Sequence, residues 1–214
     1  MKPIHSPRTT ALSLAALTLV IHSSDAANRY WDGGSVDIAA VGNTASAGGA
    51  GTWNTTLLNW DAGPVAHVAW NNAANDTAIF AGTGAAVTVA APITVGGVSL
   101  LSAGYTFTGS PIEIASNGIF TGPANGSHNF AGFALAPGNT VYRFQSSSTA
   151  ATFANNAIFT MPTGITGAGN SVVISGTQVV YLTGTNSYGG GTTINPGAAL
   201  GFTNANVTGL AAGS

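Results

Sequence analysis

Residues 179–202 read VVYLTGTNSYGGGTTINPGAALGF, and this stretch decides the fold class. Its first five residues alternate in side-chain direction, so Val180 and Leu182 face one side of a predicted strand and their neighbours face the other. The glycines at 189–191 predict a turn that glycine populates freely, and Asn-Pro-Gly at 195–197 predicts a second turn. Three strands separated by two turns within twenty-four residues fit one coil of a parallel β-helix.

The part of this stretch that reads LTGTNSYGGGTTINPGAAL resembles the autotransporter-associated β-strand repeat, whose pattern is roughly L-x-G-x-N-x-Y-x-G-G-T-x-I/V-x-x-G-x-L. The residues that fall on this pattern, with small shifts, are Leu182, Gly184, Asn186, Tyr188, Gly190, Gly191, Thr192, Ile194, Gly197 and Leu200. An extra glycine and the spacing after Pro196 depart from it, and the match covers about a tenth of the chain. The resemblance implies a secreted or surface-exposed bacterial protein, often very long, with a passenger region of β-helices.

The composition of the chain favours strands and turns over helices. Of 214 residues only 5% are charged, against roughly 25% in an average globular protein, and 30 are glycine. A disordered low-complexity chain is the alternative, but apolar residues reach 45% and strand patterns recur. The chain has no cysteine, which excludes disulfides and thiolate metal sites.

Residues 1–26 have the parts of a secretory signal peptide. Two basic residues precede an apolar run at 9–21, and Ser-Asp-Ala at 24–26 is a small-x-Ala cleavage site. We therefore predict cleavage after Ala26 and a secreted or cell-surface location for the rest of the chain. The run is short for a membrane span, and an uncleaved anchor or a buried helix stays open as the alternative.

Charge excludes one class of partner. Cleavage after Ala26 leaves Arg29 and Arg143 against five acidic residues, for a formal net charge of −3. A nucleic-acid-binding surface needs clustered Lys and Arg to neutralise phosphates, and two distant arginines cannot supply it. We therefore expect no nucleic-acid partner.

Residues 27–82 are predicted to form a tryptophan-rich N-terminal cap. The four tryptophans of the chain are Trp31, Trp53, Trp60 and Trp70. The sequences YWDGG, GTWNTTLLNWD and NDTAIFAG also look like the opening of proteins of the repeat family. Large indole rings can cover the open end of a β-stack, while their N–H groups bond to neighbouring turns. The sequence LNW further predicts that Leu58 and Trp60 alternate as in a half-buried strand.

A glycan platform is the alternative role for these tryptophans, with Asp32 or Asp61 as hydrogen-bond acceptors. Calcium is a weaker hypothesis, because the acids and amides of this region match no calcium-loop pattern. These residues are Asp32, Asp37, Asp61, Asp76, Asn59, Asn71, Asn72 and Asn75. Turn formation is the predicted role of the four aspartates, and we predict no metal and no cofactor.

Residues 83–214 are predicted to form the β-solenoid, with the repeat at about 179–202. Short extended runs such as AVTVA, PITVGGVSL and YTFTG follow one another with Gly or Pro between them. Seven phenylalanines are expected to form an interior ladder: Phe107, Phe120, Phe130, Phe133, Phe144, Phe153 and Phe159. The fold class is thus all-β, a right-handed parallel β-helix or β-solenoid with an N-terminal cap; a β-sandwich is the alternative.

Catalysis finds little support in the sequence, so we predict no enzyme and no catalytic residues. Glu113 lies between two isoleucines and is expected to face outward from a strand, and Asp76 is the nearest acid in sequence. His67 and His128 are the histidines after the signal peptide, and no G-x-S-x-G elbow occurs. Four serines are interpreted as turn residues: Ser146, Ser147, Ser148 and Ser171.

The predicted function is that of a non-enzymatic, exported or cell-surface β-solenoid passenger, an adhesin-like display rod. A carbohydrate-binding module that uses the tryptophans is the second hypothesis, and a glycan lyase or hydrolase is the third. Expected partners are extracellular glycans or further copies of the chain, with the outer membrane or cell surface reached by association only.

Overall fold

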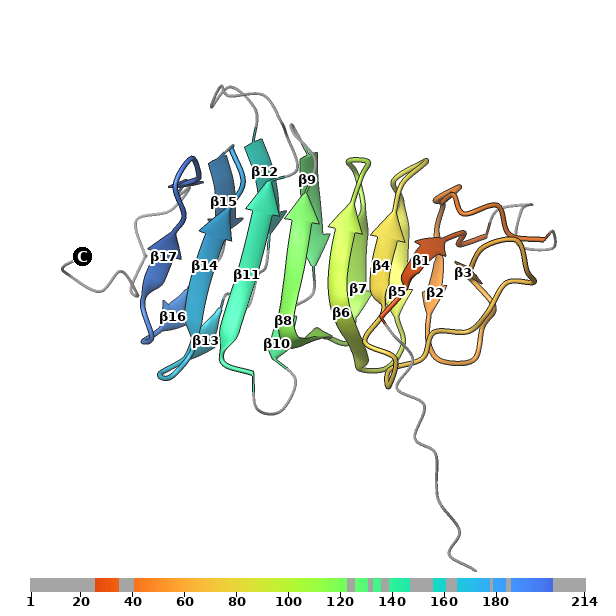
Figure 1. Ribbon diagram of the computed structural model, residues 1–214, viewed down its shortest axis with the longest axis horizontal. Coiled ribbons are helices and arrows are strands. Elements are labelled where there is room, and N and C mark those ends of the chain that lie inside the picture. The colour runs from red at the N-terminus through yellow and green to blue at the C-terminus, as the bar shows by residue number, and fades with distance from the viewer. Residues whose placement is uncertain are drawn as a thin grey trace, which may run out of the picture.

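The computed structural model describes residues 26–34, 41–122, 126–130, 133–135, 139–146, 156–160, 165–177, 179–183 and 186–201. All regular elements within these ranges are β-strands, which stand side by side along the long axis (Figure 1). Over the same ranges, the chain has no helix with the length and apolarity to cross a membrane. The predicted signal peptide lies almost entirely outside the described residues.

The first sheet has nine strands in the order β17-β14-β11-β8-β6-β4-β1-β3, with β10 beside β8. Their bounds are β1 (Asn28–Trp31), β3 (Trp60–Asp61), β4 (Thr77–Phe80), β6 (Ile93–Leu100), β8 (Ile112–Gly122), β10 (Phe133–Leu135), β11 (Val141–Ser146), β14 (Ser171–Ser175) and β17 (Thr192–Ile194). Every neighbouring pair is parallel except β1 and β3.

The second sheet has seven strands, all parallel, in the order β18-β15-β12-β9-β7-β5-β2. Their bounds are β2 (Gly51–Trp53), β5 (Ala86–Val89), β7 (Thr106–Gly109), β9 (Gly126–Phe130), β12 (Asn156–Thr160), β15 (Val179–Thr183) and β18 (Ala199–Gly201). A short parallel pair joins β13 (Thr166–Gly167) to β16 (Ser187–Tyr188). Parallel pairing distinguishes this arrangement from the antiparallel sheets of a β-sandwich.

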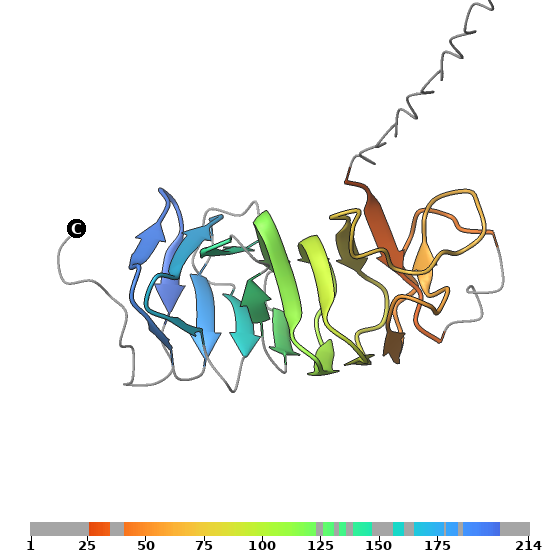
Figure 2. The same cartoon turned by 90° about the horizontal axis from the view of Figure 1, so that it is seen from below.

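The chain moves between the two sheets as it advances, which Figure 2 shows as two facing rows of strands. We call one strand of the first sheet and the following strand of the second sheet a pass. Strand partners lie twenty residues apart in four pairs of neighbouring strands, β4–β6, β5–β7, β14–β17 and β15–β18. The pairs are Thr77 with Gly97, Ala86 with Thr106, Val172 with Thr192 and Val179 with Ala199.

The core lies between the sheets, where inward side chains form rows in register. In the first sheet Val98 pairs with Phe120, Phe120 with Phe144 and Phe144 with Ile174, and all four are buried. The rings of Phe120 and Phe144 stack with centroids 5.8 Å apart. The predicted phenylalanine ladder is confirmed here and at Phe107. Phe130, Phe133 and Phe159 lie on strands whose side chains are not described there, and Phe153 lies outside the described residues.

The stretch that decided the fold class forms four strands rather than three. Val180 and Leu182 are buried on β15, as their alternation predicts. Between the expected strands lies β16, which buries the ring of Tyr188. The end of the stretch departs slightly from expectation, because β18 ends at Gly201 and Phe202 lies outside the described residues.

The two predicted turns use their glycines in different ways. Gly191 and Gly197 have φ of 83° and 85°, in the left-handed region that favours glycine. Gly190 has ordinary φ but lies against the preceding pass, where an added Cβ would be 2.6 Å from the carbonyl oxygen of Asn170. The amide of Ala198 donates to the carbonyl of Asn195 at 3.0 Å, which closes the Asn-Pro-Gly turn.

Candidate functional site in the N-terminal cap

The four tryptophans gather at one end of the stack and pack against one another. Trp31, Trp53 and Trp60 are 0% exposed and Trp70 is 2% exposed. Ring centroids lie 5.2 Å apart for Trp31 and Trp60, 4.9 Å for Trp53 and Trp60, and 4.7 Å for Trp60 and Trp70. These tilted and edge-on contacts are the favourable arrangements for aromatic pairs. The four rings therefore form one end of the hydrophobic core.

Phe80 joins this cluster to the stack of passes. Its ring lies 5.7 Å from Trp31, 5.5 Å from Trp53 and 5.5 Å from Trp60. On its other side it meets Tyr105 at 5.2 Å and Phe107 at 5.0 Å. Apolar packing is thus continuous from the cap into the first passes.

Two indole N–H groups bond to neighbouring backbone, as predicted for a cap. Trp31 donates to the carbonyl of Gly49 at 2.9 Å, and Trp70 donates to the carbonyl of Thr94 at 3.0 Å. The Nε1 atoms of Trp53 and Trp60 are buried and have no hydrogen-bond acceptor among the described residues. With all four rings buried, none offers an open face on which a sugar ring could stack.

The prediction that Leu58 and Trp60 share a half-buried strand is wrong. Leu58 is 57% exposed, whereas Trp60 is fully buried. The reason is a local turn, in which the side-chain oxygen of Asn54 accepts the amides of Thr56 at 2.9 Å and Leu57 at 2.8 Å. The turn holds Leu58 outside the strand, which begins only at Trp60.

Asp61 is a fully buried carboxylate surrounded by backbone donors. It accepts the amides of Asn43 at 2.6 Å, Thr44 at 2.7 Å and Gly63 at 2.6 Å. Burial alone raises the pKa of Asp61, but these backbone hydrogen bonds outweigh it, and the pKa lies below its usual value. The bond to Gly63 is the local turn that the sequence predicted, while the other two bring in a distant loop.

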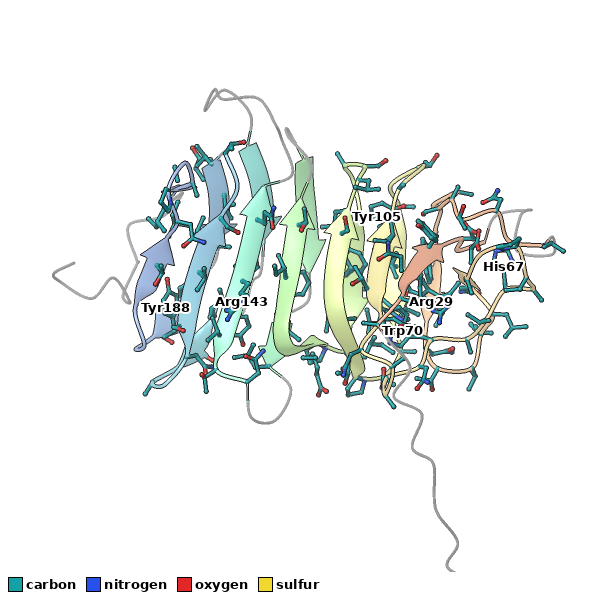
Figure 3. The ribbon with its side chains drawn as sticks, in the orientation of Figure 1. Arg29, His67, Trp70, Tyr105, Arg143 and Tyr188 are labelled. Atoms are coloured by element: carbon teal, nitrogen blue, oxygen red, sulfur yellow. The ribbon has the colours of Figure 1, made fainter. Side chains whose placement is uncertain are left out.

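Asp32 and His67 form a buried pair within the same cap, whose outer end Figure 3 marks with His67. His67 Nε2 lies 2.8 Å from Asp32 Oδ2, and Asp32 Oδ1 accepts the amide of Ala47 at 2.6 Å. The two side chains are 1% and 0% exposed. Both oxygens of Asp32 therefore bind partners that are distant in sequence, which is a different role from the predicted local turn.

Asp76 holds the beginning of the described chain. Its Oδ2 lies 2.7 Å from Nε of Arg29, and its Oδ1 accepts the backbone amide of Ala27 at 2.8 Å. The side chain of Asp76 is 3% exposed and that of Arg29 is 26% exposed. Asp76, the residue before β4, thus fixes the beginning of β1.

The candidate calcium residues do not come together. No group of three His, Asp or Glu residues able to hold a metal occurs among the residues that the structure describes. Three of the amides bond to the backbone: Asn59 donates to Thr52, Asn71 accepts from Ala73, and Asn72 bridges Pro92 and Thr94. Asn75 takes the left-handed conformation, with φ of 53°. Asp37 lies outside the described residues.

The candidate catalytic residues are likewise dispersed. Glu113 is half-buried on β8, and its Oε2 accepts the Thr94 hydroxyl at 3.2 Å. His128 lies on β9 without a described side chain, and His67 binds Asp32. Ser171 begins β14 and Ser146 ends β11, so these two lie on strands rather than in the turns predicted for them. Ser147 and Ser148 lie outside the described residues.

Sequence reasoning missed a polar network between the cap and the first passes. Ser46 donates to the carbonyl of Trp31 at 2.5 Å and accepts the amide of Ala81 at 3.0 Å. The hydroxyl of Tyr105 donates to the carbonyl of Ala81. Burial raises the pKa of Tyr105 to about 12, with the Ser46 hydrogen bond acting against it and the charge of Asp32 adding to it. No motif marks Ser46, and the alternation in YTFTG could have marked Tyr105 as inward.

Comparison with known proteins gives one partial similarity. The chain is 38% identical over 115 residues to the Adhesin BmaC autotransporter of Brucella suis biovar 1 (strain 1330). The match covers 51% of this chain and 3% of that protein, so the chain spans a small part of its relative. No family model matches the chain, and no solved structure is significantly similar to it. The chain is therefore distantly and partially similar to an autotransporter adhesin.

Proposed function

We propose that this chain is an exported, adhesin-like surface passenger, built as a right-handed β-solenoid with an N-terminal cap. The observation that carries the proposal is the 38% identity over 115 residues to a protein named as an autotransporter adhesin. The matched residues make up 3% of that relative, and the adhesin role is our proposal for this chain. The sequence pattern of residues 1–26 supports export.

The strand pairing supports the solenoid. Parallel neighbours twenty residues apart, found in four strand pairs, are what successive coils produce when each lies on the one before. The pair β13–β16 supplies a third short strand to the last passes. Crossovers between parallel strands are nearly always right-handed, which is the basis for the proposed hand. A rigid rod of this kind displays its outer faces at a distance from the point where it is held.

One outer face offers a row of neutral hydroxyl groups. Thr52, Thr88 and Thr108 are in register on β2, β5 and β7, and the last two are exposed. Adjacent strands place such hydroxyls roughly 4.8 Å apart. Each can donate and accept a hydrogen bond, which suits contact with glycan hydroxyls or with the same face of another copy.

The state of the acidic residues supports a non-enzymatic role. Asp32, Asp61 and Asp76 are buried, and both oxygens of each accept hydrogen bonds from within the cap. A glycan hydrolase instead places two carboxyl groups on either side of the substrate bond. We therefore propose that these carboxylates organise the cap and leave recognition to the outer faces.

The adhesive role can be tested with the full chain exported and purified in its processed form. Beads coated with the protein would be counted on surfaces that carry immobilised glycans. Thr88→Lys with Thr108→Lys places charge on the hydroxyl row, and Ser99→Lys with Thr121→Lys is the matched pair on the first sheet, where these residues are in register. We expect beads that carry the unaltered protein to be retained. The Thr88→Lys and Thr108→Lys pair should reduce retention, and the Ser99→Lys and Thr121→Lys pair should not. No retention on any glycan would contradict the proposal.

The tryptophan-based carbohydrate module is less well supported, because the four rings are buried. Glycan titrations followed by tryptophan fluorescence separate the two readings. Glycan contact through the hydroxyl row leaves the tryptophan emission unchanged, whereas stacking of a sugar on an indole shifts it.

A further inference from the structure

We infer that Asp76 is the receptor for the free N-terminus created by signal-peptide cleavage, so that processing completes the cap. The inference rests on the export proposed above. It starts from one contact: the backbone nitrogen of Ala27 lies 2.8 Å from Asp76 Oδ1. Ala27 is also the residue that follows the predicted cleavage site, and Ala26 before it is exposed.

Cleavage changes the chemistry of this contact without moving it. Hydrolysis by a signal peptidase adds water across the bond between Ala26 and Ala27, leaves a carboxylate on Ala26 and makes the nitrogen of Ala27 an amine. At neutral pH that amine takes up a proton and becomes an α-ammonium. A neutral N–H donor to the Asp76 carboxylate is thereby replaced by a charged one, which adds the attraction of an ion pair to the hydrogen bond already made.

The position of Ala27 is fixed from both sides. Its carbonyl oxygen accepts the amide of Thr77 at 2.8 Å, the first bond between β1 and β4. Asp76 is held in turn, because its own carbonyl accepts the amide of Gly96 at 2.9 Å. A Cβ on Gly96 would lie 1.9 Å from the carbonyl oxygen of Asn75, so this approach admits only glycine.

The charge of Asp76 is divided between two cations after cleavage. Arg29 occupies Oδ2 at 2.7 Å and leaves Oδ1 to the N-terminus. Asp76 is 2% exposed, so water screens the charge of its carboxylate little. The side chain of Arg29 is 26% exposed, so water partly screens the charge of its guanidinium. Two positive charges, each on its own oxygen of the Asp76 carboxylate, make a compact ion cluster. The cluster joins the N-terminus, β1 and the residue before β4.

The sequence makes this contact unusually easy to probe. Lys2 is the only lysine of the chain, and it belongs to the predicted signal peptide. After cleavage at Ala26, the α-amine of Ala27 is therefore the sole primary amine in residues 27–214. An amine-specific reagent such as acetic anhydride then removes this one charge and keeps an N–H donor on the same atom.

The test uses the full chain with a site-specific protease sequence in place of residues 21–26, cut in vitro so that Ala27 becomes the first residue. At pH 6.5 we expect cutting to raise the melting temperature by about 2–4 °C, the range that a modest stabilisation gives in a chain of this size. Acetylation of the cut protein should reverse the gain. Asp76→Asn should abolish it, and Glu113→Gln, which alters a half-buried carboxyl on β8, should retain it.

Three results would overturn the inference. The first is an equal melting temperature before and after cutting, and the second is an equal gain in the Asp76→Asn protein. The third is an exported product whose mass shows a first residue other than Ala27. The acetylation experiment needs no substitution, so it decides the question even where Asp76→Asn fails to fold. A failed adhesion assay would leave the cutting result unchanged, so the two proposals fail separately.

Discussion

His67 Nε2 lies 2.8 Å from Oδ2 of Asp32, and the pair is sealed inside the cap with side-chain exposures of 1% and 0%. Asp32→Ala removes the acceptor of both His67 and the amide of Ala47. Leaving a buried donor without its acceptor typically costs about 1–3 kcal/mol. We expect a loss of this size in the urea unfolding of the Asp32→Ala protein. Glu113→Ala, at a half-buried surface position, should change stability by no more than about 0.5 kcal/mol, and equal losses would contradict the role given to Asp32.

Asp61 should make the cap sensitive to acid. Its folded-state pKa lies below the ordinary value of 3.8 because backbone hydrogen bonds hold the carboxylate. A depressed pKa gives stability that is present above the ordinary pKa and is lost as pH falls through the folded one. Melting temperatures from pH 7 to pH 2 should therefore fall steeply below about pH 4. In Asp61→Asn that fall should be shallower, and an unchanged slope would show that Asp61 contributes nothing to it.

Tyr105 should make the cap sensitive to alkali. Burial raises the pKa of Tyr105 from 10.0 to about 12. Its contribution to folding stability is therefore complete below pH 10 and is lost as pH rises towards 12. A rise of this size in the pKa corresponds to roughly 3 kcal/mol of stability. We expect urea midpoints to fall over this range and Tyr105→Phe to fall less, after losing about 1 kcal/mol at neutral pH with the bond to Ala81. Burial also raises the pKa of Tyr142 and Tyr188, so a residual decline should remain in the variant.

Glycine at position 190 should be required by the close approach of two passes. A methyl group there would lie 2.6 Å from the carbonyl oxygen of Asn170, and overpacking of this kind typically costs about 1–3 kcal/mol. Gly169 is the matched control, because an added Cβ there meets nothing within 4 Å and its φ is ordinary. Thermal unfolding should show a lower midpoint for Gly190→Ala and an equal or higher one for Gly169→Ala. The reverse order would contradict the packing described for this turn.

The sequence predicted the features that depend on local pattern. Alternation placed Val180 and Leu182 inside, and the Asn-Pro-Gly turn closed where expected. Both follow from the two-residue period of a strand and from the φ that glycine supplies. The same reasoning failed at Leu58, because the side chain of Asn54 forms a turn that a simple alternation count does not register.

The partners of the cap carboxylates could not be predicted in the same way. Asp32 meets His67 across 35 positions, and Asp76 meets Ala27 across 49. Each pair joins residues separated by long stretches of the cap, and no spacing rule connects them. The sequence therefore predicted a structural role for these aspartates, while the geometry alone showed that Asp32, Asp61 and Asp76 all bind partners that are distant in sequence.

The spacing of strand partners has a consequence for how such a chain changes in length. A pass that is duplicated in frame brings its own strands and turns with it, so its inward side chains return to the interior and its strands to their rows. Recombination between neighbouring gene segments would then lengthen or shorten the rod without a new folding problem to solve. Length becomes a quantity that selection can adjust separately from the chemistry of the faces.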